Sequence, residues 1–502
     1  MKTLSALSLI LLGSTLHAQA HPQWGNLEPG PYAVGVRVIN AWDYSRTWWP
    51  PRDWRGQDHP GESARPIQIV IWYPVDPRTS AGGLMTYGDY LDFWATELGT
   101  RSDSLKAAKT REYRQGPFAP SFPNGITDAD WARITGVRTA ARDSAPPARE
   151  RFPLLIQAGI GGASAQSVMH EYLASHGYVI ASTPFLNTSP AWHDRGEWSA
   201  RALDEEVRDI GFVLGEMREQ PYVDRTRVAV IGMGAHSGIL FQMRTGLLDA
   251  VAMLDVNFPE AMRRLTYYDP VNVRIPILDL PNTEYPRDDE SLLDSLRYAE
   301  RFLVRASELP HVDFYQFKRV GRPETAGEQR NYESIARYAR RFLDATLKGS
   351  AAARDSLLAG PFPTTRRAAL PAAPTEAEFL TLVRYRGIEP GVALYREVKA
   401  RDPGARMFSI DGLRTVSFFL MRDHGIAAAT TGLDLIVEAY PDSAKAHKYA
   451  GDWYARGQVS ATARQHYETA LAKLPADNSL AVEERRRMEV EVREAMGRLP
   501  PP

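Results

Sequence analysis

The residues of clearest chemical interest form a glycine-rich turn between an apolar run and a helical stretch. The apolar residues 228–231 lead into the sequence Gly-Met-Gly-Ala-His-Ser-Gly at 232–238, and a helix is expected to begin near Ile239. A tight strand–turn–helix of this kind pushes one side chain into a site, and small neighbours let the backbone turn that sharply. Acyl transfer at such a turn needs an oxygen nucleophile and a base within hydrogen-bond reach. Ser237 and His236 are the residues of those types in this turn.

Short apolar runs that alternate with helical stretches must position this turn. Six later runs read as strands buried on both faces, and two earlier runs alternate between apolar and polar residues, as antiparallel edge strands do. The pattern predicts a mainly parallel sheet covered by helices on both faces. The expected strands are 31–38, 65–74, 152–157, 178–181, 227–232, 250–255, 275–280 and 311–317, and the expected helices are 200–219 and 332–347.

Composition excludes several classes of protein. The chain has 502 residues, 44% of them hydrophobic and 24% charged, with a formal net charge of -1. These globular values exclude a disordered chain, a coiled-coil rod and a multi-span membrane protein, and the balanced charge gives no reason to expect nucleic acid as a partner. There is no cysteine, which excludes disulfides, thiolate metal sites and cysteine nucleophiles. Because nucleotide-binding and metal-ligand spacings are also missing, we expect no cofactor and no metal.

The N-terminus has the pattern of an export signal. Lys2 precedes an apolar stretch at 4–12, and Ala18-Gln19-Ala20 has the form of a cleavage site. The apolar stretch is too short to cross a bilayer. We therefore expect residues 1–20 to be removed as a signal peptide. The mature chain is expected to be periplasmic or extracellular, without a membrane span.

A change of composition predicts two domains. Residues 21–350 hold the strands and helices given above, and the polar residues 76–150, broken by Pro and Gly, are expected to be a surface excursion with one helical piece near 87–98. Residues 351–374 are rich in Ala and Pro, which is typical of a linker.

The chain from 375 to 502 reads as helical. Pro441 precedes Pro475 by 34 residues, the period of a tetratricopeptide repeat, in which small residues and aromatics pack two helices together. We expect a tetratricopeptide-like domain here, and a protein partner that binds through it. The residues with the spacing of one such unit are Gly451, Tyr454, Ala463, Tyr467, Ala470 and Pro475.

Four segments between about residues 30 and 350 carry a resemblance to a known family: 65–74, 85–90, 152–185 and 224–259. They are similar to secreted bacterial α/β-hydrolases of the platelet-activating-factor acetylhydrolase and dienelactone-hydrolase-like group. The resemblance implies an α/β-hydrolase fold and a cleft for a small acyl or lipid-like ligand. It implies also, in active members, cleavage of small esters by a Ser-Asp-His triad.

The resemblance assigns roles to particular residues. Asp255 follows Leu254 as the triad acid does in the family's L-D motif. The segment 158–162 stands where the family has its oxyanion sequence, so the backbone N–H groups of Ile160 and of Ala235 would be the oxyanion donors. His311 opens an expected strand and is expected to be structural. His193 is expected either to line the cleft or to lie on the surface.

The chain departs from the family's pattern at two positions. The nucleophile of the family's G-H-S-x-G-G turn is replaced by Gly234, which has no side-chain oxygen. Arg322 stands at the position of the triad histidine, and arginine stays protonated. These two losses predict a catalytically degenerate ester hydrolase that binds a ligand or a partner.

Ser237 leaves an alternative open. A longer turn would present Ser237 as a displaced nucleophile, and the protein would then be an active serine ester hydrolase using Asp255 and an unassigned histidine. Against this reading, a shift of three residues moves the side chain from the strand end into the first turn of the helix, where serine is common.

Overall fold

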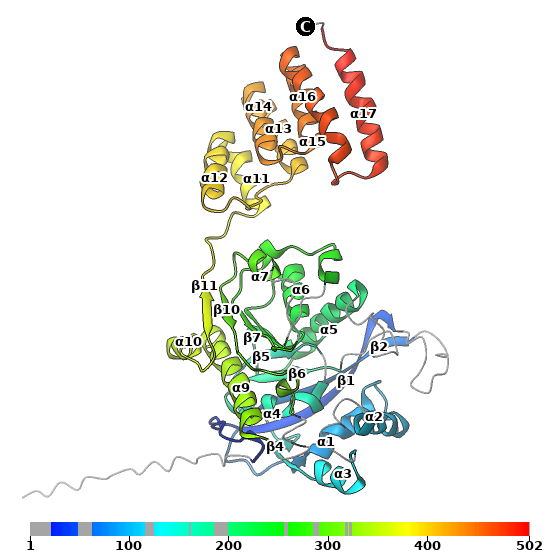
Figure 1. The fold of residues 1–502 in the computed structure, drawn as a ribbon, viewed down its shortest axis with the longest axis vertical. Helices are drawn as coiled ribbons and strands as arrows, with labels where there is room; N and C mark the ends of the chain where they lie inside the picture. The colour runs from blue at the N-terminus through cyan, green and yellow to red at the C-terminus, as the bar shows by residue number, and fades with distance from the viewer. Residues whose placement is uncertain are drawn as a thin grey trace, which may run out of the picture. The chain divides into compact units, whose positions relative to one another are not determined.

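The computed structural model describes residues 22–48, 63–115, 125–159, 162–184, 199–255, 260–284, 291–316, 320 and 324–500. The chain consists of two units, Met1–Leu370 and Pro371–Pro502, which are drawn in Figure 1. The expected signal peptide, residues 1–20, lies outside the described residues.

The described strands all belong to the first unit. They are β1 (Ala33–Trp48), β2 (Ser63–Val75), β3 (Leu84–Thr86), β4 (Arg138–Asp143), β5 (Phe152–Gln157), β6 (Val179–Ser182), β7 (Val223–Met233), β8 (Ala250–Leu254), β9 (Ile277–Leu280), β10 (Arg301–Val304) and β11 (Thr364–Arg367).

These strands form one sheet in the order β11-β10-β9-β8-β7-β5-β6-β2-β1-β4-β3 (Figure 1). From β6 to β10 each strand is parallel to its neighbour, whereas β2 is antiparallel to both β1 and β6. Parallel neighbours require crossover connections, which helices supply here. This is the arrangement of an α/β-hydrolase domain followed by an all-helical region, so the predicted fold class is confirmed.

The main helices of the first unit are α1 to α7, α9 and α10, and those of the second are α11 to α17. Their bounds are α1 (Tyr87–Asp92), α2 (Asp103–Gln115), α3 (Asp128–Thr135), α4 (Gly162–Ser175), α5 (Ala200–Arg218), α6 (His236–Thr245), α7 (Ser291–Ser295), α9 (Ala326–Leu347), α10 (Ala351–Leu358), α11 (Glu376–Arg386), α12 (Ile388–Arg401), α13 (Ile410–His424), α14 (Ile426–Ala439), α15 (Ala444–Arg456), α16 (Ser460–Lys473) and α17 (Val482–Gly497).

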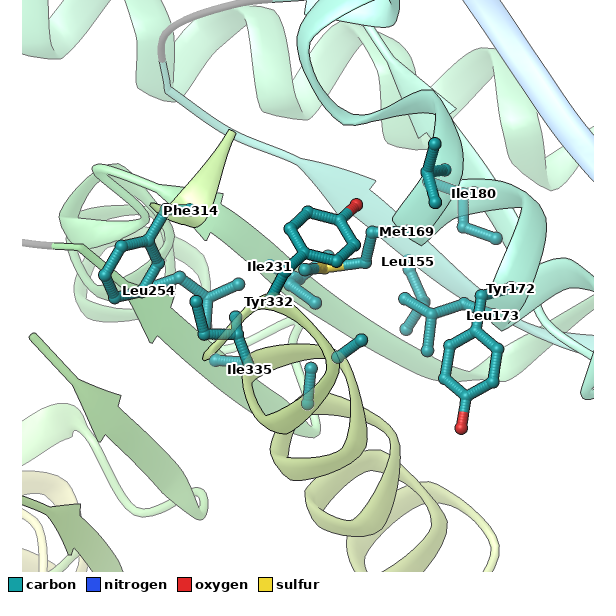
Figure 2. Close-up of a cluster of buried hydrophobic side chains, with 14 of the residues drawn as sticks. Leu155, Met169, Tyr172, Leu173, Ile180, Ile231, Leu254, Phe314, Tyr332 and Ile335 are labelled. Carbon is teal, nitrogen blue, oxygen red and sulfur yellow. The ribbon is translucent and has the colours of Figure 1, made fainter. Parts of the chain in front are cut away.

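Two apolar cores cover the two faces of the sheet, because successive residues of a strand point to opposite sides. In β7, Ile231 packs in a core with α4 and α9, and its neighbour Val230 packs in the other core with α5 and α6. Figure 2 shows the first core, in which Leu254 of β8 gathers with Phe314 and with Tyr332 of α9. The turn after β7 is therefore held between buried layers.

The helical piece expected near 87–98 is present as α1 and a 3-10 helix at Phe93–Thr96, but the prediction that the rest of 76–150 is a surface excursion was wrong. Residues 76–150 supply β3, β4 and three helices, and Tyr87 and Tyr90 are fully buried. Tyr90 Oη donates to Glu171 Oε1 at 2.7 Å and accepts from Trp72 Nε1 at 2.9 Å. Buried tyrosines with satisfied hydroxyls anchor this segment to α4 and β2. The early strands β1 and β2 consequently lie inside the sheet, and β3 forms its edge.

The expected strand at 311–317 was also wrong. Residues His311–Phe314 form a 3-10 helix, η6, and the sixth parallel strand is β10. The four residues of β10 are all buried between the two faces of the sheet. The aromatic side chains Phe314 and Tyr315 instead pack in the first core from outside the sheet.

The expected linker, 351–374, begins too early. Residues 351–358 form α10, and β11 pairs antiparallel with β10. The composition of residues 351–374 resembles that of a linker because α10 is alanine-rich and β11 is a short, polar edge strand. The division between the two units falls after Leu370.

Candidate functional site

The turn after β7 has the geometry expected of a nucleophile turn, with a glycine at its centre. Gly234 lies between the end of β7 and the start of α6 and has φ of 88°, a value that side-chain-bearing residues adopt at a cost. A Cβ on Gly159 would lie 1.6 Å from the carbonyl oxygen of Met233, and one on Gly232 would lie 2.1 Å from that of Ala158. Glycine is thus required where the loop after β5 touches the turn.

Asp255 lies beside Gly234 at the carboxyl ends of adjacent strands. The register pairs Met233 of β7 with Leu254 of β8, so the residues that follow them, Gly234 and Asp255, are neighbours. Asp255 has φ of 56°, uncommon for a residue with a side chain. Its side chain is only 2% exposed. A strained and buried carboxylate needs partners.

Two side chains hold the Asp255 carboxylate. Asn282 Nδ2 donates to Oδ1 at 2.7 Å, and His311 Nδ1 lies 2.6 Å from Oδ2. Asn282 follows β9, and His311 is the first residue of η6, which follows β10 in the chain. The acid and the imidazole therefore come from the same edge of the parallel sheet as the Gly234 turn.

Burial and charge act on this pair in opposite directions. Burial raises the pKa of the Asp255 carboxyl, although its contact with His311 opposes the shift. Burial would lower the pKa of His311, but the contact with Asp255 and the charge of Glu284 outweigh it and raise that pKa above its ordinary value of 6.5. The pair therefore favours the protonated form of the imidazole.

Two glutamines tie η6, which carries His311, to the helix that follows the oxyanion segment. Gln166 Nε2 of α4 donates to the carbonyl of Phe314 at 2.8 Å and lies 3.2 Å from Met233 Sδ. Gln316 Oε1 accepts from the N–H of Val168 at 2.7 Å, and its Nε2 donates to the carbonyl of Ser164 at 2.6 Å. These buried bonds fix η6 relative to α4 and to the residue before Gly234.

Ser237 lies in the first turn of α6 and is fully buried. Its hydroxyl lies against the carboxyl of Glu206 on α5, which also accepts the N–H of Gly159 at 2.6 Å. Burial raises the pKa of Glu206 to about 8, against the hydrogen bond from Gly159. The described contact of Ser237 is thus with α5 and not with the Asp255–His311 pair.

The sequence-predicted residues meet different outcomes. Asp255 and Gly234 lie side by side, and Ala235 follows Gly234 as a fully buried residue. Ile160, Arg322 and His193 lie outside the described residues, so their predicted places stay predictions. His236, next to Ser237, is fully buried, and burial lowers its pKa to about 3.

Sequence reasoning missed His311 as the partner of Asp255. Its alternating aromatic neighbours were interpreted as a strand, and the family resemblance placed the histidine position after that strand, at Arg322. Two signals point the other way: Pro310 precedes His311 directly, and the apolar run Arg301-Phe302-Leu303-Val304 was available as the last parallel strand. A histidine soon after that strand, and before the last helix of the unit, fits the chain order Ser, acid, His of this fold.

Within the described residues, no group of three or more His, Asp or Glu side chains is placed to hold a metal ion. None of the described helices combines the length and apolar character that crossing a bilayer requires. The groups described at this site are an imidazole–carboxylate pair and a turn centred on Gly234.

Comparisons with known proteins give little more. No family model matches the chain, and no curated protein matches it. Among solved structures it is similar to a ferulic acid esterase from Streptomyces cinnamoneus, with 18% sequence identity and a TM-score of 0.43, covering 67% of this chain and 97% of that one. A match at this level carries no argument about activity. The fold assignment rests on the strand order.

Proposed function

We propose that the first unit is an ester-hydrolase-type domain that has lost serine catalysis and binds a small acyl or lipid-like ligand in its cleft. The observation that supports this is the glycine at the centre of the turn, next to an intact Asp255–His311 pair. Asp255 would orient the imidazole, and the other ring nitrogen, Nε2, would take a proton from a nucleophile. Gly234 provides no hydroxyl to give that proton.

The domain should regain catalysis when the missing oxygen is supplied. We would measure hydrolysis of p-nitrophenyl acetate and butyrate by the mature chain and by Gly234→Ser, Gly234→Ala and Gly234→Ser/His311→Ala. The wild type and Gly234→Ala are expected to stay at background. Gly234→Ser is expected to gain about a hundredfold or more, and the double variant to lose that gain, because nucleophile and base act as a unit.

The same assay tests the alternative of a displaced nucleophile. A robust wild-type rate that Ser237→Ala abolishes, or labelling of Ser237 by a fluorophosphonate probe, would replace the proposal with an active serine hydrolase. The ligand part is tested by quenching of tryptophan fluorescence with p-nitrophenyl butyrate. A lack of saturable quenching would contradict it.

For the second unit we propose a tetratricopeptide-like role, in which the helices bind a protein partner after export of the chain. The support is the pairing of α15 with α16, where Gly451 lies against the ring of Tyr467 as such repeats require. Deleting residues 375–502 tests the role. An unchanged set of interacting proteins would refute it.

A further inference from the structure

A surface pocket of about 360 Å³ lies between α13 and α15 of the second unit. Lining residues spaced mainly by three or four positions place one face of each helix toward it. The pocket combines aromatic rings with two arginines and one aspartate. The lining residues are Arg414, Thr415, Phe418, Phe419, Tyr449, Asp452, Trp453 and Arg456.

The two arginines lie over aromatic rings. Arg414 Cζ is 4.5 Å from the ring centroid of Tyr449, and Arg456 Cζ is 5.4 Å from that of Trp453. A guanidinium attracted to the face of a ring can still use its N–H groups for bidentate bonds to a carboxylate. Both arginines are exposed.

The nearby carboxylates are engaged elsewhere. Asp411 pairs with Lys445 at 2.5 Å, and Asp452 pairs with Lys448 at 2.9 Å. In the described part of the second unit neither Arg414 nor Arg456 forms an ion pair. Arginines outside the pocket, for example Arg396 with Glu438 and Arg493 with Glu489, do form one.

An apolar anchor lies between these cations. Phe418 is 51% exposed, which is high for a phenylalanine, and Trp453 is 6% exposed and forms part of the pocket wall. Exposed aromatic surface beside fixed charges is typical of binding sites. The pocket therefore fits a ligand with both an apolar side chain and carboxylates.

The spacing of the cations suggests an extended peptide. Arg414 lies over Tyr449, and Arg456 is seven residues further along α15, which at 1.5 Å per residue is roughly 10 Å. An extended chain advances about 3.3 Å per residue, so roughly three residues span that distance. The second unit has 18 basic and 18 acidic residues. This balance gives the unit no net positive charge to favour nucleic acid or an anionic bilayer.

We propose that this pocket binds an extended acidic segment of a partner protein, with two carboxylates about three residues apart and an apolar side chain between them. The proposal rests on the partner role of the second unit and names the chemistry of that partner. Arg414 and Arg456 bind the two carboxylates, and Phe418 contacts the apolar side chain.

The test uses fluorescence anisotropy with the full mature chain and labelled, blocked hexapeptides. One peptide carries two Glu residues three apart around a Leu, and its matched forms carry Gln or Lys in place of Glu. The protein variants are Arg414→Gln/Arg456→Gln, Phe418→Ser and, as a control on exposed helix surface, Arg396→Gln/Arg493→Gln. Single-stranded DNA and phosphatidylglycerol vesicles serve as the other probes.

The acidic peptide is expected to bind, and the double pocket variant and the Gln peptide to weaken binding about tenfold or more, since charge-assisted bonds are lost. The control variant should bind as the wild type does, and added salt should weaken binding. Equal affinity for the Gln peptide, no effect of the pocket variants, no peptide binding, or preference for DNA or vesicles would each overturn the proposal. If the peptides fail but deletion of 375–502 still removes a partner, the partner role stands and only the pocket assignment falls.

Discussion

At the scale of residues, the backbone angle of Asp255 is a main argument for the candidate site. Asp255 adopts φ of 56° while its side chain is nearly inaccessible, and both features oppose folding. This unfavourable conformation and burial allow the contact with His311, which orients the imidazole at the strand ends. Strained and buried ionisable residues concentrate at functional sites, so this pair marks the strand ends around Asp255 as the candidate site.

The His311 pKa gives a prediction in the Gly234→Ser background. A base must be neutral to accept a proton, so activity should fall as pH falls through the His311 pKa, at a midpoint above 6.5. Glu284→Gln removes a charge that raises this pKa and leaves the contact with Asp255 intact. The variant should shift the midpoint to lower pH with little loss of maximal rate. A pH–rate profile checks both expectations, and an unshifted midpoint would contradict the role assigned to Glu284.

Glu206 gives a prediction for stability. Its folded pKa of about 8 exceeds its ordinary 4.5, so near pH 7 the folded carboxyl is protonated and the unfolded one ionised. The contribution of Glu206 to the free energy of unfolding is fully present below pH 4.5 and is lost as pH rises through 8. Between these values the free energy of unfolding falls on the order of 1.4 kcal/mol per pH unit.

Glu206→Gln should remove this pH dependence, because an amide does not titrate. The amide oxygen can still accept the N–H of Gly159. Urea unfolding between pH 5 and 8 is the measurement. The stability difference between variant and wild type should grow in the variant's favour as pH rises. Glu219→Gln, at the exposed C-terminal cap of α5, is the matched control for loss of a carboxyl group in the same region. A constant difference across pH would show that Glu206 is ionised in the folded protein.

At the scale of elements, apolar runs predicted the parallel strands because each is buried on both faces. The prediction of strands from apolar residues failed where side chains are buried by packing outside the sheet. Residues 311–317 alternate like a strand, yet Phe314 and Tyr315 are buried against helices. The contact of His311 with Asp255 could therefore not be predicted from periodicity. The turn at Gly234 could be predicted, since its glycines lie between an apolar run and a helical stretch.

The contact between the loop after β5 and the turn after β7 gives a prediction about an element. Gly159→Ala would place a methyl group 1.6 Å from a backbone carbonyl at φ of 90°, and backbone cannot move aside easily. We expect a loss of about 3 kcal/mol or more, or failure to fold. Gly215→Ala on α5 is the matched control: nothing lies within 4 Å of its Cβ, so helix propensity should stabilise the domain by about 0.5–1 kcal/mol. Equal effects on the urea midpoint would contradict the close approach.

At the scale of the whole molecule, composition indicated two domains but misjudged where the first one ends. Alanine and proline at 351–374 suggested a linker, although β11 completes the sheet and the carbonyl of Arg297 accepts the N–H of Leu370 at 2.9 Å. Edge strands bury few apolar side chains, so their sequences resemble connections. Composition was enough to predict that there are two domains. The boundary between them could not be predicted because it depends on the pairing of β11 with β10, which is distant in the sequence.

Two units with separate cores should unfold as two transitions, and a change in one core should move only its own transition.

A Cβ on Gly451 would lie 2.7 Å from ring carbons of Tyr467, whose ring is buried and whose hydroxyl donates to Asp452 at 2.9 Å. Gly451→Ala should therefore lower the stability of the second unit by about 1–3 kcal/mol, because the ring cannot retreat without losing that bond. Gly497→Ala, where nothing lies within 4 Å of the Cβ, is the control in the same unit. Differential scanning calorimetry of the full chain is the measurement. If both transitions move together in Gly451→Ala, the two units are one cooperative structure, and a partner bound to the helices would then also stabilise the hydrolase-type domain.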